Sequence, residues 1–133
     1  MLTCKLQGGL GNQLFQIYTT IAYADQTNSK FFFSNTYELK CSVTNRHTYW
    51  DTFLSNLKPF LLDPELINKD KNKDNILVLR EKGFSYNALP LPLPIQKAKI
   101  QMLNGYYQSS KYFDNYFQSI NRLLQIDTLK VKL

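Results

Sequence analysis

The pattern of apolar and polar residues predicts strands and helices in alternation over the first part of the chain. A short apolar run, Leu2–Leu6, is typical of a buried strand. After a glycine-rich turn, apolar residues recur at helical spacing from about Asn12 to Gln26, and Lys30–Phe33 is typical of a second buried strand. Strand, helix and strand in this order form a βαβ unit. We therefore expect a parallel sheet with a right-handed crossover.

The middle of the chain is less regular and predicts one short helix and two further strands. Apolar residues at helical spacing predict a helix over Thr48–Leu57 that ends before Pro59. Short strands are predicted at Ile76–Leu79 and Lys99–Leu103. Between these strands, leucine and proline alternate in Leu89–Pro94, which favours an extended connector because proline has no N–H group to donate.

The last part of the chain has a helical pattern followed by alternating apolar and basic residues. Apolar side chains predict an amphipathic helix from Tyr112 to Leu124, with Ser109 or Ser110 as its N-cap. Leu129–Leu133 alternates as a strand does. The whole pattern predicts an α/β fold with a Rossmann-like parallel sheet, in a single domain over residues 1–133.

Composition indicates a globular chain with a basic balance. Hydrophobic residues make up 44% of the 133 residues, which is too many for a disordered chain, and the formal net charge is +6. The basic residues are dispersed or alternate with acids, as in Lys69–Asp74. This run predicts a solvated loop instead of a nucleic-acid-binding face, so we expect no nucleic acid among the partners.

Targeting and metal-binding signals do not stand out. No apolar run approaches the roughly 20 residues that a membrane-spanning helix needs, and the N-terminus lacks the pattern of a signal peptide. Cys4 and Cys41 form no disulfide framework, and His47 has no second histidine or nearby nucleophile. We expect a cytoplasmic protein without a transmembrane segment or bound metal, and we interpret His47 as an ordinary loop residue.

The strongest candidate for chemistry is Gly8–Gln16, with the sequence GGLGNQLFQ. It lies between a predicted strand and a predicted helix, where backbone N–H groups and the helix dipole favour an anion such as phosphate. It has neither the Lys-Ser/Thr pair of a Walker loop nor the glycine spacing of a dinucleotide fingerprint. Asn12 and Gln13 are compatible with helix capping alone, whereas the glycines before them permit positive φ and close approach of a ligand. The residues alone leave both interpretations open.

This segment resembles the N-terminal signature of the family 11 glycosyltransferases, the α-1,2-fucosyltransferases that use GDP-fucose. Two later stretches support the resemblance. Tyr49–Leu54 is similar to the aromatic helix of that family, and Gly105–Phe113 is similar to its Gly-Tyr-Phe-Gln-Ser-x-Lys-Tyr-Phe block. The three blocks bracket positions 8–113, which is most of the chain.

The resemblance implies the N-terminal half of a two-domain GT-B enzyme with inverting chemistry and no metal requirement. Such an enzyme transfers L-fucose from GDP-fucose to a galactoside hydroxyl in α-1,2 linkage. Its transition state is oxocarbenium-like, so hydrogen-bond donors at the departing diphosphate lower the barrier. The glycine loop lies near the donor in related enzymes. This implies four donor-binding residues: Gly9, Gly11, Asn12 and Gln13. Tyr107–Lys111 is expected to be structural.

The chain departs from the family in one respect. The family has a downstream His-x-Arg-Arg-x-Asp block whose arginine neutralises the GDP phosphates, whereas Arg46, Arg80 and Arg122 are not adjacent. The sequence also contains no counterpart of the family's C-terminal domain, which holds most of the GDP. We expect a chain that is inactive or weak alone and that needs a separate C-terminal half. The alternatives are a non-catalytic carbohydrate-binding module and an inactive remnant.

Overall fold

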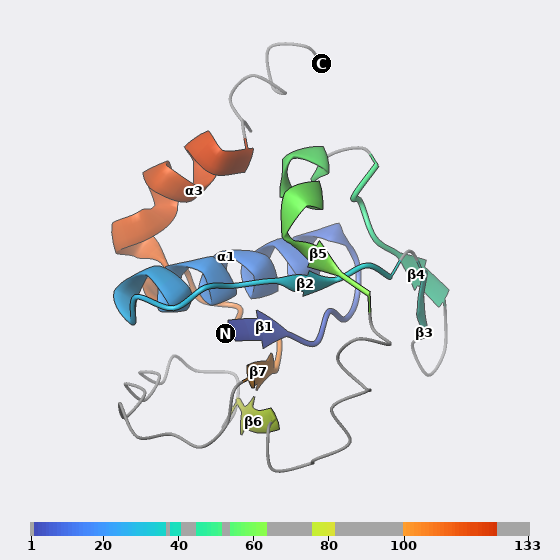
Figure 1. The fold of residues 1–133 in the computed structure, drawn as a ribbon, viewed down its shortest axis with the longest axis horizontal. Helices are drawn as coiled ribbons and strands as arrows, with labels where there is room; N and C mark the ends of the chain where they lie inside the picture. Colours follow the sequence, from blue (N-terminus) through green and yellow to red (C-terminus); the bar gives the residue numbers. More distant parts are fainter. Residues whose placement is uncertain are drawn as a thin grey trace.

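The computed structural model describes residues 2–36, 38–40, 45–51, 54–63, 76–81 and 100–124. Short strands lie beside one long helix, and a second helix packs against the first (Figure 1). The strands are β1 (Leu2–Cys4), β2 (Phe33–Ser34), β3 (Glu38–Lys40), β4 (Asn45–His47), β5 (Leu61–Leu62), β6 (Ile76–Arg80) and β7 (Ile100–Asn104). The helices are α1 (Leu10–Gln26) and α3 (Phe117–Leu124), with the 3₁₀ helices η1 (Ser55–Phe60), η3 (Ser110–Tyr112) and η4 (Asp114–Tyr116).

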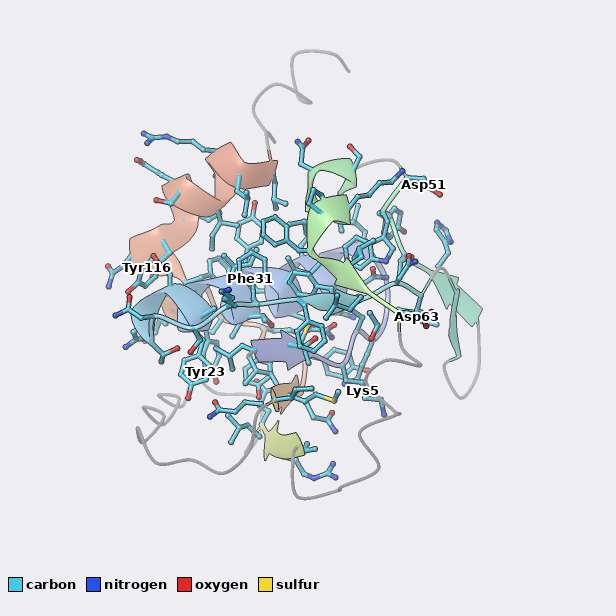
Figure 2. The ribbon with its side chains drawn as sticks, viewed as in Figure 1. Lys5, Tyr23, Phe31, Asp51, Asp63 and Tyr116 are labelled. Atoms are coloured by element: carbon cyan, nitrogen blue, oxygen red, sulfur yellow. The ribbon has the colours of Figure 1, made fainter. Side chains whose placement is uncertain are left out.

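The main sheet has the strand order β1, β7, β6, and both strand pairs are parallel. On the other side of β1, Phe31, which Figure 2 labels, makes a parallel bridge to Leu2. The Leu2 N–H donates to the Lys30 carbonyl at 2.8 Å, and the Phe32 N–H donates to the Leu2 carbonyl at 2.9 Å. β2 in turn pairs in parallel with β5. Parallel segments therefore follow one another in the order β5, β2, β1, β7, β6 (Figure 1).

The strand order reverses at β1. Helix α1 leads from β1 to β2 on one side, whereas β7 lies on the other side of β1. In open α/β sheets, ligands bind outside the carboxyl ends of the strands at such a point. The predicted βαβ unit and the mixed α/β fold with a small parallel sheet are confirmed. The loops that follow β1 and β7 lie at this reversal of the strand order.

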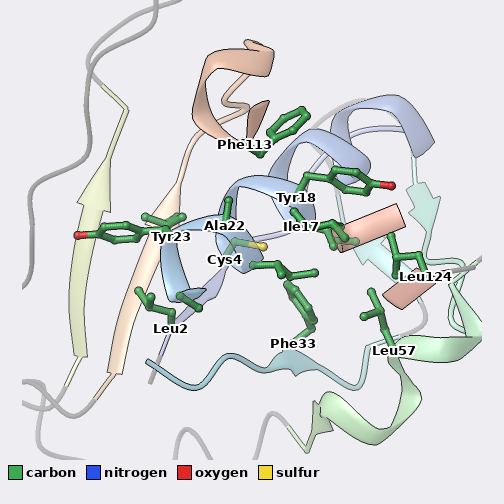
Figure 3. Close-up of a cluster of buried hydrophobic side chains, with 14 of the residues drawn as sticks. Leu2, Cys4, Ile17, Tyr18, Ala22, Tyr23, Phe33, Leu57, Phe113 and Leu124 are labelled. Carbon is green, nitrogen blue, oxygen red and sulfur yellow. The ribbon is translucent and has the colours of Figure 1, made fainter. Parts of the chain in front are cut away.

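The core lies between the sheet and α1 (Figure 3). Leu2 and Cys4 of β1 are buried under α1, together with Leu103 of β7 and Ile17 of the helix. Burying a side chain of this size stabilises the fold by about 1.5–3 kcal/mol. The first predicted helix is confirmed, although it begins at Leu10, two residues before the expected start. The first strand is shorter than predicted, and the second is shifted to β2, with only a bridge at Phe31.

The predicted helix over Thr48–Leu57 is wrong in its position. The structure has instead η1, which begins at Ser55 and contains Pro59. The cause is visible in the preceding residues. The Thr48 Oγ1 and the Trp50 indole N–H both donate to the Thr36 carbonyl, at 2.7 and 3.1 Å. These two bonds hold the segment against the chain beyond β2, and its conformation is set by that distant contact instead of by its apolar spacing.

The predicted helix from Tyr112 to Leu124 is divided into η3, η4 and α3. The interruption falls at Phe113, whose backbone has φ −141° and ψ 10°. Its ring is buried and packs edge-on against Tyr18 of α1, with the ring centroids 5.3 Å apart. Burial of this ring therefore takes precedence over a continuous helix. The Ser109 Oγ accepts the Lys111 N–H at 3.3 Å, so this residue lies at the start of η3 and does not cap a helix that runs to Leu124.

Three further predictions fall outside the described residues: the loop at Lys69–Asp74, the connector at Leu89–Pro94 and the strand at Leu129–Leu133. Cys41 also lies outside them. Among the helices that the structure describes, none has the length and apolar character needed to cross a membrane.

Candidate functional site at the carboxyl ends of β1 and β7

The loops that follow β1 and β7 meet at the carboxyl edge of the sheet. Two hydrogen bonds between side chains join them. The Gln7 Nε2 donates to Asn104 Oδ1 at 3.2 Å, and the Gln108 Nε2 donates to Asn12 Oδ1 at 2.6 Å. The paired residues are 97 and 96 positions apart in the sequence. The site is therefore built by the sheet topology and not by neighbours in the chain.

The turn after β1 depends on a glycine at position 8. Gly8 has φ +76°, and a Cβ atom there would lie 2.6 Å from the Asn12 Nδ2. A side chain at this position is therefore strained by the backbone conformation, and it would also displace the side chain of Asn12. The prediction that the glycine turn uses positive φ is confirmed at Gly8.

Helix α1 begins without a capping side chain. Its N-cap is Gly9, which has no side-chain hydrogen bond to give, and its first turn has no acidic residue. The first helical hydrogen bond runs from the Gln13 N–H to the Gly9 carbonyl at 3.0 Å. The N–H groups of the first turn, including that of Gly11, therefore form the positive end of the helix dipole. No acidic side chain in this turn compensates that charge.

Gly11 has no packing reason to be a glycine. It is exposed, and a Cβ built on it would meet nothing within 4 Å. Glycine within a helix costs about 1 kcal/mol relative to alanine. The open space over Gly11 thus lies directly at the helix N-terminus, where an external group can approach the backbone.

Two buried glutamines hold the turn from below. Gln16 accepts the Gln7 N–H at 2.9 Å and donates to the Gln7 carbonyl at 3.2 Å. Gln13 donates to the carbonyls of Gly8 and His47, at 3.0 Å each. Both glutamine side chains are 0% exposed. The position of Gln13 therefore indicates a supporting role beneath the loop, in place of the direct donor contact that the sequence predicts.

The loop after β7 is held by an acidic residue at the end of β6. The Glu81 carboxylate accepts the N–H groups of Tyr106 and Tyr107, both at 3.1 Å. A Cβ on Gly105 would lie 2.4 Å from the Glu81 Cβ, so the close approach of the two strand ends requires glycine at this position.

Tyr107 adopts a strained backbone in this loop. Its φ is +52°, which is unusual for an aromatic residue. Its side chain is buried, and its hydroxyl donates to the Leu79 carbonyl at 3.1 Å. Burial, reinforced by the nearby Glu81 carboxylate, raises the pKa of the Tyr107 phenol above its ordinary value. The burial of the Tyr107 ring and the hydrogen bond of its hydroxyl offset the backbone strain. The next residue, Gln108, is exposed and donates to Asn12.

The structure brings together three of the four predicted donor-binding residues. Gly9, Gly11 and Asn12 lie at least partly exposed at the start of α1, whereas Gln13 is buried. Tyr107 has the structural role that the sequence predicts. Gln108 was assigned the same role, yet it is exposed and reaches Asn12.

Sequence reasoning missed Gln7, Glu81 and Asn104. A usable signal was present, because each is a polar residue at or just beyond the carboxyl end of a strand. His47 is exposed, and its ring packs against Tyr49 with centroids 4.8 Å apart. In the described part of the chain, no three His, Cys, Asp or Glu side chains are grouped so as to hold a metal ion.

A hollow of about 270 Å³ lies elsewhere, between the C-terminal part of α1 and α3. Phe31 and Tyr116 are among its lining residues, and Figure 2 labels both. Its lining is mainly apolar, and it lies toward the end of α1 that is remote from Gly9. It is therefore separate from the site at the carboxyl edge. Comparisons of the chain with protein-family models, curated proteins and solved structures found no match.

Proposed function

We propose that the chain is the N-terminal α/β half of a GT-B glycosyltransferase of the family 11 type. Its reaction would be the transfer of L-fucose from GDP-fucose to a galactoside hydroxyl in α-1,2 linkage. One observation carries the proposal. The bond between Gln108 and Asn12 joins two of the three sequence blocks that resemble the family, across 96 positions of the chain. Their meeting at the carboxyl edge of a parallel sheet supports a shared binding role.

In this proposal the start of α1 faces the diphosphate of GDP-fucose. Backbone N–H groups at Gly9 and Gly11 and the amide of Asn12 supply hydrogen-bond donors, and the uncompensated helix dipole adds positive potential. Negative charge grows on the diphosphate as the bond to fucose breaks, so these donors interact more strongly in the transition state than with the intact donor. The remaining charge would be neutralised by a separate C-terminal half, and the chain alone would be inactive or weak.

The test is a transfer assay with GDP-fucose and a galactoside. The chain is assayed alone and after addition of the C-terminal half of a family 11 enzyme. We expect little or no transfer alone and a gain of fucosylated product with the added half. Rapid turnover by the chain alone would contradict the need for a second half. Absence of GDP-fucose binding together with absence of rescue would contradict the proposal as a whole.

A second candidate function is a non-catalytic carbohydrate-binding module. It is favoured by the neutral character of the side chains that join the two loops, which are all amides: Gln7, Asn12, Asn104 and Gln108. Amide groups both donate and accept hydrogen bonds, as sugar hydroxyls require. Galactoside binding that GDP-fucose leaves unchanged would favour the module. Binding of GDP-fucose that strengthens galactoside binding would favour the transferase.

A further inference from the structure

A row of three polar residues crosses the carboxyl edge of the sheet and takes no part in the loop contacts of Asn12. Arg80 at the end of β6 pairs with Asn104 at the end of β7. The β1–β7 ladder also continues beyond Cys4, because the Lys5 N–H donates to the Leu103 carbonyl at 2.9 Å. Lys5, Asn104 and Arg80 therefore lie side by side at the carboxyl ends of three neighbouring strands, with the amide between the two cations.

The pleat of the sheet places this row on the face opposite α1. Successive side chains of a strand point to opposite faces. Cys4 and Leu103, which precede Lys5 and Asn104, are buried in the core under α1, and Figure 3 shows Cys4 there. Lys5 and Arg80 are exposed. Figure 2 labels Lys5 beyond the end of the β1 arrow. Both long cationic side chains are thus free to reach into solvent from the same face.

The charges in this row are not neutralised by the described residues. An ion pair among the described residues joins Lys58 to Asp51, on η1 and the segment before it, and involves neither cation of the row. The acid next to Arg80 is Glu81, whose carboxylate accepts two backbone N–H groups in the loop after β7. Neither Lys5 nor Arg80 has an acidic partner in the part of the chain that the structure describes.

The amide between the cations is oriented as a donor. Asn104 Oδ1 accepts the Gln7 Nε2 at 3.2 Å, which leaves the NH₂ group of Asn104 to donate. Neighbouring strands are about 4.8 Å apart, so the backbones at Lys5 and Arg80 are roughly 10 Å apart. Lysine and arginine side chains are long enough to close on one anion over that span. The planar fork of arginine matches two oxygens of a phosphate.

We propose that Lys5, Asn104 and Arg80 form a binding site for a phosphate-bearing anion, with a diphosphate as the best match. The site needs neither fucose nor an acceptor and so goes beyond the proposed function. From the sequence, we expect a separate C-terminal half to supply the positive charge that neutralises a diphosphate. In this proposal, Lys5 and Arg80 of this chain supply part of that charge. The two cations are 75 positions apart in the sequence, and only the strand register brings them into one row.

The experiment titrates the full chain with inorganic pyrophosphate at constant ionic strength and measures affinity by calorimetry. Lys5→Gln and Arg80→Gln are compared with two controls that remove the same charge elsewhere. Lys30→Gln lies at the opposite, amino edge of the sheet, and Arg122→Gln lies on α3. We expect each site variant to weaken binding by about tenfold or more, because a hydrogen bond between charged groups is lost, and each control to change it by less than about twofold.

Equal losses in all four variants, or no pyrophosphate binding by the unmodified chain, would overturn the proposal. Far-ultraviolet circular dichroism of each variant checks the fold. If Lys5→Gln unfolds, Lys5→Arg replaces it and must retain pyrophosphate binding.

Parallel titrations with inorganic phosphate, GDP and GDP-fucose separate this proposal from the donor proposal. If pyrophosphate binding depends on Lys5 and Arg80 while GDP-fucose binds no more tightly than pyrophosphate, the anion site stands and the fucosyl-donor proposal fails. If GDP-fucose binds the unmodified chain and both site variants equally, the anion site fails and the donor proposal stands.

Discussion

The Gln108 side chain donates a hydrogen bond to Asn12 Oδ1 at 2.6 Å, and this bond joins the loop after β7 to the first turn of α1. Asn12 thus has two neighbours of different origin. Its amide nitrogen lies over Gly8, where a Cβ would force the Asn12 side chain to move, and its oxygen accepts a hydrogen bond from a residue 96 positions away in the sequence. This arrangement allows stability and ligand binding to be tested separately.

Replacing Asn12 by Asp is expected to separate the two properties. The carboxylate keeps an acceptor for Gln108 and places negative charge in the first turn of α1, which stabilises a helix by about 0.3–1 kcal/mol. The same charge repels a diphosphate. Thermal unfolding should show an unchanged or higher midpoint, and titration with GDP-fucose should show a loss of binding. Retained binding in Asn12→Asp would remove Asn12 from the donor site.

Gly11 and Gly8 are expected to respond in opposite ways to alanine. Gly11→Ala should raise the free energy of unfolding by about 0.4–1 kcal/mol, because the space is open and the helical backbone suits alanine. Gly8→Ala should lower it by about 1–2 kcal/mol or more, because of its positive φ and the contact with Asn12. Chemical denaturation measures both.

The binding assay adds a second reading for Gly11. If a ligand approaches the backbone there, Gly11→Ala weakens GDP-fucose binding although it stabilises the fold. A variant that is more stable and binds as well as the unmodified chain would show that the open space over Gly11 has no role in binding.

Gln16 is expected to contribute strongly to stability. Its replacement by Leu removes the hydrogen-bond partner of the partly buried N–H and carbonyl of Gln7, which costs up to about 1–3 kcal/mol. The matched control is Gln26→Leu, at the exposed end of the same helix, with an expected effect within about 0.5 kcal/mol. Equal free energies of unfolding for the two variants would contradict the role of Gln16.

Cys4 is expected to make stability depend on pH in the alkaline range. Burial raises the pKa of its thiol from 9.0 to about 12, against a smaller opposite effect of a hydrogen bond with Thr20. Below pH 9 both folded and unfolded thiols keep their proton, so the contribution to stability is complete. Above pH 9 the unfolded thiol loses its proton first, and stability falls by about 1.4 kcal/mol per pH unit until about pH 12.

Cys4→Ala provides the comparison for this slope. Unfolding free energies of the two proteins are measured between pH 8 and the pKa region of the buried thiol, and the difference between them should shrink as pH rises. The alanine variant loses packing at every pH, so the change of the difference with pH is the quantity that matters. A constant difference would show that the thiol ionises in the folded protein as readily as in the unfolded one.

The sequence predicts the local helices and strands of this fold better than the tertiary contacts between them. The strand, glycine turn and helix at the N-terminus follow from periodicity and from Gly8, because both signals are local. The division of the last helix at Phe113 and the shifted η1 depend on contacts with α1 and with Thr36. Such contacts come from distant parts of the chain and leave no periodic signal.

The candidate site was predictable only in part for the same reason. The glycine turn with Asn12 stood out because three glycines and an asparagine fall within five positions. Glu81 and Asn104 stand alone in the sequence and acquire a role through the register of β6 and β7. Gln13 shows the reverse case, since its place next to Asn12 suggested ligand contact while the helix turns it into the core.

The pairing of β1 with β7 also sets the order in which the molecule can be assembled. Gln101, the partner of Leu2, is synthesised 99 positions after it. Closing so long a loop has a large entropic cost, and contacts of this range form slowly. Helix α1 can therefore form early, while the carboxyl edge with its glycine turn and its row of cations is completed only late in folding, after the strand that carries Asn104 has been synthesised.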